Sequence, residues 1–356
     1  MKTRVGILGA SGYGGAELLR RFLHHPNVEV SAIGSRQYEG KGIAACWPQL
    51  AGLYKNLLFQ TNDDVIKNCD VVFCATPHGE TAPLVKKAID AGRKVIDLSA
   101  DFRLPPELYE TWYGHPHPHP ELYDLARFGL VELHRDELKD SRLIGNPGCN
   151  SSTAILALAP LAANNLLGQD IIVNIVTGAS GAGRSPSQGF HYTELNEGAR
   201  PYNVAGKHRH TVEVEMTLGR IMSMGRRLQT HADFDMPVVT FNPHLVPMSR
   251  GIIATCYTRP ETSVALTDKV LLELYTTFYK NDPMIVVQED LPQSKSVWGS
   301  DRAIVTARYD SRTGHIIAFA TIDNMGKGAA GQAVQNFNVM HGLEETLGLM
   351  LGGIWP

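Results

Sequence analysis

The chain opens with TRVGILGASGYGG (residues 3–15), and this stretch decides the fold. Residues 3–9 form the apolar run of a buried strand, a glycine-rich turn follows, and apolar periodicity predicts a helix over residues 17–23. A strand, a glycine turn and a helix in that order suit a dinucleotide pyrophosphate. Gly9 would make the turn, Gly12 would let the phosphate approach the backbone, and Gly15 would allow close packing. The G-x-x-G-x-x-G spacing is not the usual G-x-G-x-x-G, and a plain tight turn would need the same glycines.

The next predicted strand, residues 28–34, ends in Ser35 and Arg36. A fold that prefers NAD usually carries an acidic residue there for the ribose hydroxyls, whereas a hydroxyl and a guanidinium suit a 2′-phosphate. The sequence therefore predicts NADP(H) as the cofactor. The alternative is that Arg36 is an ordinary solvated surface residue.

Strands are also predicted over residues 71–75 and 94–98, with a helix over 80–91 between them. Alternating strands and helices predict an α/β domain, a Rossmann-type doubly wound parallel sheet. Ligands bind outside the carboxyl ends of such strands, and residues 99–103 follow one of them. Arg103 is therefore a candidate anion clamp, with an exposed or aspartate-paired arginine as the alternative.

The stretch GNPGCNSS (residues 145–152) places Cys149 between a Pro-Gly turn and a helical pattern over residues 151–161. The N-terminus of a helix favours an anion, so the thiol there should ionise readily and act as a nucleophile. The alternative is a small buried cysteine. The five cysteines lack C-x-x-C spacing, which indicates free thiols in a reducing compartment.

After residue 149 the pattern changes to a second, α+β catalytic domain with a mixed sheet. Strands are predicted over residues 171–178, 237–241, 251–257, 284–287, 303–308 and 315–322, and helices over 212–224 and 263–279. The flat face of this sheet would suit subunit pairing. A last amphipathic helix, with Val334, Phe337, Met340 and Leu343, is expected to return to the first domain. The expected division is residues 1–148 and 326–356 for the NADP-binding domain, and 149–325 for the catalytic and oligomerisation domain.

Two histidines, His208 and His210, precede the predicted helix 212–224. Cysteine catalysis on carbonyl compounds generally needs an imidazole to carry protons, although such residues also occur in ordinary loops. A second histidine group, HPHPHP at residues 115–120, invites a metal interpretation. A polyproline-like segment turns every three residues, so its alternate histidines do not share a face, and we predict a stiffened loop and no metal.

Composition excludes several classes of protein. The 356 residues are 43% hydrophobic and 19% charged, with a formal net charge of −3, as in ordinary globular proteins. Lysine and arginine are scattered, and no apolar run approaches the roughly 20 residues of a membrane span. The N-terminus lacks signal-peptide features. We therefore expect a cytoplasmic protein with no nucleic-acid or membrane partner.

Taken together, the motifs resemble one family. They are Gly9-x-Ser11-Gly12-Tyr13-x-Gly15, Leu98 to Arg103, Gly145 to Cys149, Ser180 to Gly183, His208 to Thr211 and Lys327 to Gln332. In this order they are similar to the N-acetyl-γ-glutamyl-phosphate reductase family, the NADPH-dependent enzymes of arginine biosynthesis related to aspartate-semialdehyde dehydrogenase. The resemblance spans nearly the whole chain. The His-Pro run and Asn150-Ser151 fit the family pattern least well.

The resemblance implies reduction of N-acetyl-L-glutamyl 5-phosphate to N-acetyl-L-glutamate 5-semialdehyde and phosphate. Cys149 would form a thioester, and NADPH would deliver hydride to it. His210, which is followed by a hydroxyl residue as in related enzymes, would be the acid–base group, and His208 would face the substrate. The reverse order stays open, because both imidazoles could reach the thiol from the same loop. The expected substrate-binding residues are Arg103, Asn146 and His208. The expected cofactor-binding residues are Gly9, Ser11, Gly12, Tyr13, Gly15, Ser35, Arg36, Ser180, Gly181, Gly183 and Asn336.

Other functions remain open at this point. The same chemistry could act on α-aminoadipyl phosphate linked to an acidic carrier protein, but the slightly acidic chain does not favour that partner. Aspartyl phosphate reduction should show other residues where His208-Arg209-His210 stands. A non-catalytic nucleotide-binding regulator would not need Cys149 or the histidine pair. The expected partners are a small acyl phosphate and further copies of the chain, in a dimer or tetramer.

Overall fold

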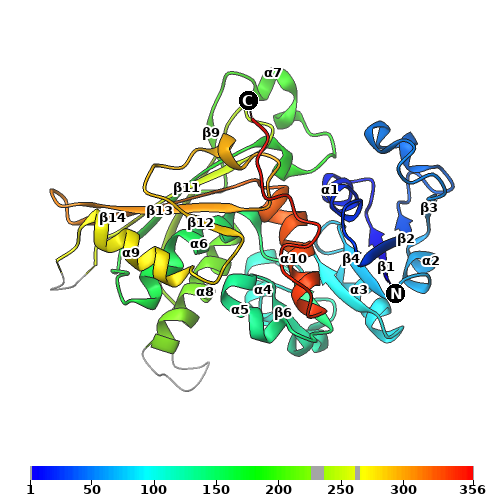
Figure 1. The fold of residues 1–356 in the computed structure, drawn as a ribbon, viewed down its shortest axis with the longest axis horizontal. Coiled ribbons are helices and arrows are strands. Elements are labelled where there is room, and N and C mark those ends of the chain that lie inside the picture. Colours follow the sequence, from blue (N-terminus) through cyan, green and yellow to red (C-terminus); the bar gives the residue numbers. More distant parts are fainter. Residues whose placement is uncertain (1, 226–235, 261–264, 356) are drawn as a thin grey trace. The chain divides into compact units, whose positions relative to one another are not determined.

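The computed structural model describes residues 2–225, 236–260 and 265–355, which form two compact units (Figure 1). Unit 1 comprises Met1–Pro147 and Ala329–Met350, and unit 2 comprises Gly148–Gly328 and Leu351–Pro356. The chain leaves unit 1 after Pro147, so that Gly148 and Cys149 begin unit 2, and it re-enters unit 1 directly after Gly328. The sequence-based division assigned all of residues 326–356 to the cofactor domain, whereas the last residues pack with unit 2.

Unit 1 is built on a seven-stranded sheet in the order β3-β2-β1-β4-β5-β7-β6, and its strand pairs are parallel. The strands are β1 (Thr3–Leu8), β2 (Val28–Gly34), β3 (Phe59–Gln60), β4 (Val71–Cys74), β5 (Lys94–Asp97), β6 (Ala126–Phe128) and β7 (Leu143–Gly145). The predicted doubly wound sheet is confirmed. The strand order reverses at β1, because β2 and β3 lie on one side of β1 and β4 and β5 on the other. The carboxyl end of β1 is therefore the expected ligand position.

Helices cover both faces of this sheet. They are α1 (Tyr13–Phe22), α2 (Asn62–Lys67), α3 (Ala82–Asp90), α4 (Pro106–Tyr113), α5 (Val131–Leu138) and α10 (Gly331–Met340), with short 3-10 turns at Ile43–Ala45, Pro48–Leu50 and Pro120–Leu125. One apolar cluster joins Ile7 and Phe73 to Val334 and Phe337 of α10, and the other joins Val72 to Val85 of α3. The last helix, drawn in red, therefore completes the core of the N-terminal unit, as its apolar periodicity predicts (Figure 1).

Unit 2 contains a mixed sheet in the order β12-β13-β14-β11-β8-β10-β9, which confirms the predicted mixed sheet. Its strands are β8 (Ile171–Thr177), β9 (Arg200–Pro201), β10 (Val239–Leu245), β11 (Ile252–Thr258), β12 (Ile285–Val287), β13 (Ala303–Asp310) and β14 (His315–Ile322). β10 extends beyond the predicted 237–241 because Pro243 does not end it. β10 is the second strand from the edge of the sheet, and the edge strand β9 has two residues. Proline is tolerated near the edge of a sheet.

The helices of unit 2 are α6 (Cys149–Ala163), α7 (Tyr192–Leu195), α8 (His210–Gly225) and α9 (Asp268–Phe278). Short 3-10 turns occupy Ala179–Ala182, Gln188–Phe190 and Ser294–Val297, and a π-helical turn spans Gly326–Ala330. The predicted start of the long helix at Ser263 was wrong. α9 begins at Asp268 because the Thr267 side chain accepts a hydrogen bond from the Val270 N–H at 3.2 Å. Residues 263 and 264 themselves lie outside the described residues.

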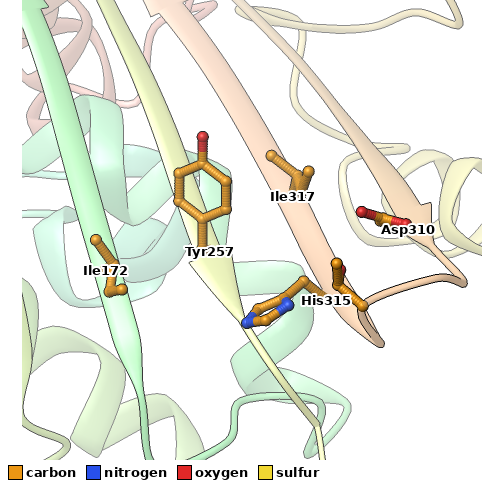
Figure 2. Close-up of a pocket in the computed structure, with 6 residues that line it drawn as sticks. Ile172, Tyr257, Asp310, His315 and Ile317 are labelled. Atoms are coloured by element: carbon orange, nitrogen blue, oxygen red, sulfur yellow. The ribbon is translucent and has the colours of Figure 1, made fainter.

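The two faces of the second sheet differ. Alternate residues such as Cys256 and Ala318 are fully buried on the side that α6 covers. On the other face, Ile172, Tyr257 and Ile317 form a row across three neighbouring strands (Figure 2). Ile172 remains 38% exposed. Within the described parts of the chain, none of the helices has the length and apolar character needed to span a bilayer.

Candidate active site

The glycine-rich turn lies at the carboxyl end of β1 in unit 1. Gly9 has φ +75°, and a Cβ there would lie 2.4 Å from the Ala75 carbonyl oxygen. A Cβ on Gly15 would lie 2.4 Å from the Ala10 Cα. Gly12 is the N-cap of α1, and a Cβ there would meet nothing closer than 3.4 Å. Two glycines are thus needed for packing, while the third leaves the start of α1 open for a phosphate group.

Further predicted cofactor residues lie around this turn. The hydroxyls of Ser11 and Ser35 are 2.8 Å apart, which brings the turn and the end of β2 together. Tyr13 packs beside Trp47 with ring centroids 6.2 Å apart. Arg36 pairs with Glu80, with Nη2 and Oε2 separated by 2.7 Å. The arrangement fits an adenine dinucleotide with a 2′-phosphate, because hydroxyls and a cation stand where a carboxylate would select NAD.

Arg103 and Asn146 meet at the carboxyl ends of β5 and β7. The Arg103 Nε donates to the Asn146 carbonyl at 2.7 Å, and its Nη2 donates to the Leu98 carbonyl at 3.0 Å. The Asn146 N–H donates to the Asp97 carbonyl at 2.7 Å. Burial and the Asp101 carboxylate raise the pKa of Asp97 to about 7, although hydrogen bonds from Ser99 and then the Arg103 charge act to lower it. These contacts fix the last residues of unit 1 before Cys149, and the substrate-binding roles of Arg103 and Asn146 stay predictions.

Asn336 belongs to the same polar group. It is fully buried on α10, and its Nδ2 donates to the Gly129 carbonyl and to the Asn146 Oδ1, both at 2.9 Å. A Cβ on Gly129 would lie 2.4 Å from that nitrogen. Both protons of the amide nitrogen are therefore used inside unit 1. The predicted contact between Asn336 and the nicotinamide stays a prediction.

The candidate nucleophile, Cys149, is the first residue of α6, with Gly148 as the N-cap. It is partly exposed, whereas the other four cysteines are buried. Burial raises the pKa of Cys69 to about 11 and raises the pKa values of Cys74 and Cys256 further. Of the five thiols, Cys149 is therefore the one that a substrate can reach at the positive end of a helix.

Glu213 links the start of α6 to the candidate base. Its carboxylate is buried, and Oε2 accepts hydrogen bonds from the Gly148 N–H at 2.9 Å and the Ser151 hydroxyl at 2.7 Å. Its other oxygen lies 3.9 Å from Nε2 of His210. A Cβ on Gly148 would lie 2.4 Å from that same nitrogen. The His210 imidazole therefore packs directly against the residue before Cys149.

His208 occupies a different environment from His210. Its Nδ1 accepts a hydrogen bond from the His210 backbone N–H at 3.1 Å, and its ring packs against Phe241 and Tyr202 with centroids 5.0 and 5.5 Å away. Burial, with the His210 charge as a smaller cause, lowers the pKa of His208 to about 3. His208 is thus neutral near pH 7, with its proton on Nε2.

Asn150 and Tyr202 complete the surroundings of the thiol. The Asn150 Nδ2 donates to the Tyr202 hydroxyl at 3.1 Å, and its Oδ1 lies 3.9 Å from the Cys149 sulfur. Burial, followed by the Cys149 charge, raises the pKa of Tyr202 to about 12. Sequence reasoning missed these two residues and Glu213. The one available signal was Glu213 at i+3 from His210 in the first turn of a helix.

The small-residue segment after β8 is held by Asn324. The Asn324 Nδ2 donates to the Ser180 hydroxyl at 2.8 Å, and its Oδ1 accepts from the Gly251 N–H at 2.8 Å. Gly181 lies within this 3-10 turn, and Gly183 ends it with φ +81°. On the returning chain, a Cβ on Gly328 would lie 2.8 Å from the Cys149 Cβ. The nicotinamide-binding roles of Ser180, Gly181 and Gly183 stay predictions.

The His-Pro run buries one histidine. The His117 Nε2 donates to the Asp101 carbonyl at 2.6 Å, and its Nδ1 accepts from the His119 N–H at 3.0 Å. Its ring packs between Tyr109 and Phe102, with centroids 4.8 and 5.1 Å away. His117 therefore supports the loop that carries Arg103. In the described ranges, no three His, Cys, Asp or Glu residues are grouped to hold a metal ion.

Comparison with known proteins defines the class first. Residues 4–141 match the semialdehyde dehydrogenase NAD binding domain, and residues 149–324 match the semialdehyde dehydrogenase dimerisation domain. The fold is similar to that of aspartate semialdehyde dehydrogenase II from Vibrio cholerae, with a TM-score of 0.71 at 17% identity, covering 95% of this chain and 98% of that one. The enzyme from Candida albicans, solved with NADP, gives a TM-score of 0.65 at 18% identity, with the same coverage. The two domains and the fold are therefore those of a semialdehyde dehydrogenase.

Curated relatives define the family within that class. The N-acetyl-gamma-glutamyl-phosphate reductase of Thermus thermophilus is 48% identical over 99% of this chain and 100% of its own length. That of Symbiobacterium thermophilum is 42% identical over the whole of both chains. The chain belongs to the N-acetyl-gamma-glutamyl-phosphate reductase family, which confirms the resemblance seen in its motifs.

Proposed function

We propose that the protein catalyses the NADPH-dependent reduction of N-acetyl-L-glutamyl 5-phosphate to N-acetyl-L-glutamate 5-semialdehyde and phosphate, a step of arginine biosynthesis. The observation that carries this proposal is the accessible Cys149 at the start of α6, with His210 packed against the preceding residue. The family relationship and the glycine turn with Ser35 and Arg36 support NADP(H) as the cofactor.

In the proposed mechanism, His210 takes the thiol proton and the Cys149 thiolate attacks the acyl phosphate carbon. The carbon–oxygen bond to phosphate breaks, and His210 returns the proton to the departing phosphate. The bound cofactor supplies hydride for the resulting thioester. Cys149 then leaves as a thiolate when the carbonyl re-forms as an aldehyde. Glu213, at ion-pair distance, would orient His210 and stabilise its protonated form.

The rival substrates are separated by one assay of the reverse reaction. We expect phosphate-dependent NADP⁺ reduction to proceed at least about 100-fold faster, in kcat/KM, with N-acetylglutamate semialdehyde than with aspartate or aminoadipate semialdehyde. The reason is that polar groups placed for one substrate are left unpaired by another. Equal or greater activity with free or carrier-linked aminoadipate semialdehyde would contradict the arginine assignment. A lack of activity with every semialdehyde would favour the non-catalytic regulator.

We further propose that the protein forms a homodimer or tetramer through the row of Ile172, Tyr257 and Ile317 (Figure 2). The family description of residues 149–324 as a dimerisation domain supports this. Ile172→Glu should dissociate the dimer or tetramer into smaller species, because it places a charge in an apolar interface. Leu291→Glu, at a residue 60% exposed outside the sheet, is the control. Analytical ultracentrifugation that shows a monomeric wild-type protein would contradict the proposal.

We also propose that the protein is located in the cytoplasm. Five free cysteines, with no disulfide among them, suit a reducing compartment.

A further inference from the structure

An ion pair crosses the edge of the cofactor site in unit 1. Arg36 follows β2, and Glu80 lies between β4 and α3, with Nη2 and Oε2 separated by 2.7 Å. In the sheet, β2 and β4 are the two neighbours of β1. The pair therefore spans the carboxyl end of β1, where the glycine turn begins. It joins the residue expected to bind the 2′-phosphate to a carboxylate that the family motifs do not include.

The Glu80 carboxylate is attached to a firmly held loop. The Gly79 N–H donates to the Asp101 carboxylate at 2.8 Å, and the Thr81 hydroxyl contacts the Thr76 hydroxyl at 2.7 Å and the Pro77 carbonyl at 2.9 Å. Thr81 is fully buried and Asp101 likewise. The backbone on both sides of Glu80 is thus fixed, so its carboxylate stays within reach of Arg36.

We propose that Glu80 is a specificity-determining residue whose carboxylate competes with the cofactor 2′-phosphate for the Arg36 guanidinium. This inference rests on the proposed role of Arg36. The side chains of Arg36 and Glu80 are 84% and 56% exposed, so the pair is solvated and opens readily. A 2′-phosphate that binds Arg36 must first displace the Glu80 carboxylate from the guanidinium. NADH carries no such phosphate, so Glu80 narrows the preference of the protein for NADPH over NADH.

The test measures the Kd values of NADPH and NADH by fluorescence titration for the wild type, Glu80→Gln, Arg36→Gln and the double variant. At low salt, Glu80→Gln should bind NADPH about 2- to 5-fold more tightly than the wild type does, which is the range expected for one solvated ion pair. Its affinity for NADH should equal that of the wild type. The gain should disappear at about 1 M salt, where the Debye length is about 3 Å. The double variant should match Arg36→Gln, because Glu80 acts through Arg36.

Asp70→Asn is the matched control. Asp70 pairs with Arg4 at 2.7 Å, and the two side chains are 45% and 50% exposed. Arg4 lies near the start of β1 and Asp70 directly before β4, at the opposite end of the same strands. The change in net charge equals that of Glu80→Gln, and NADPH affinity should not change.

The outcomes separate this inference from the proposed function. If Arg36→Gln leaves the NADPH Kd unchanged, the proposed role of Arg36 fails. If Arg36→Gln weakens NADPH binding but Glu80→Gln has no effect at low salt, the role of Glu80 fails alone. An equal gain in Asp70→Asn, or an equal gain for NADH, would show a general charge effect and would also overturn the role of Glu80.

Discussion

Cys149→Ser should lower kcat by at least about 10⁴-fold, the scale of loss seen when a covalent nucleophile is removed. A serine hydroxyl at the start of α6 has nearly the same size but is scarcely ionised near neutral pH, so the attack on the acyl phosphate is lost. The measurement is steady-state NADPH oxidation with the acyl phosphate, together with phosphate-dependent NADP⁺ reduction in reverse. Both directions should fail together because both pass through the thioester in the proposed mechanism.

Two controls make this result specific. The NADPH Kd and the circular dichroism spectrum of Cys149→Ser should equal those of the wild type, since the glycine turn proposed to bind the cofactor belongs to unit 1. Cys46→Ser, at a buried cysteine of unit 1, should retain turnover. A Cys149→Ser protein that keeps wild-type turnover would refute the thioester mechanism.

His210→Asn should lower kcat/KM by about 10²- to 10⁴-fold, the usual contribution of a general acid–base group. The effect of His208→Asn should be clearly smaller. Because burial lowers the pKa of His208 to about 3, its imidazole is a weak proton acceptor near pH 7. In the native protein the His208 Nδ1 accepts from the His210 N–H at 3.1 Å, and the asparagine oxygen can replace Nδ1 as that acceptor.

The pH profile distinguishes the two histidines beyond the size of the loss. If the activity falls on the acid side because an imidazole becomes protonated, that limb should persist in His208→Asn and be absent from the residual activity of His210→Asn. Persistence of the limb in His210→Asn and its loss in His208→Asn would reverse the two assignments.

Strong periodic patterns made most of the fold predictable. The strands at residues 28–34 and 315–322 match β2 and β14 at both ends, and the glycine turn with its flanking elements identified the first domain. Short segments were not predicted. α4 and α5, with eight residues each, are too short for apolar periodicity to separate them from loops. The start of α9 was misplaced because its boundary depends on the Thr267 cap rather than on hydrophobic pattern.

The candidate site was only partly visible in the sequence. Cys149, His208 and His210 carry their chemistry in their residue type and local spacing. Glu213, Asn150 and Tyr202 do not, because their importance comes from hydrogen bonds between segments far apart in the chain. The burial that separates His208 from His210 likewise arises from Phe241 and Tyr202, which local sequence around the histidines does not reveal.

The position of Glu213 has an evolutionary consequence. One carboxylate on α8 accepts hydrogen bonds at the start of α6, which presents the sulfur, and lies at ion-pair distance from the His210 imidazole. A replacement at this acid is therefore expected to disturb the surroundings of the sulfur and of the imidazole together. Divergence toward a new substrate is therefore expected to leave this anchor untouched and to alter the outlying loops instead.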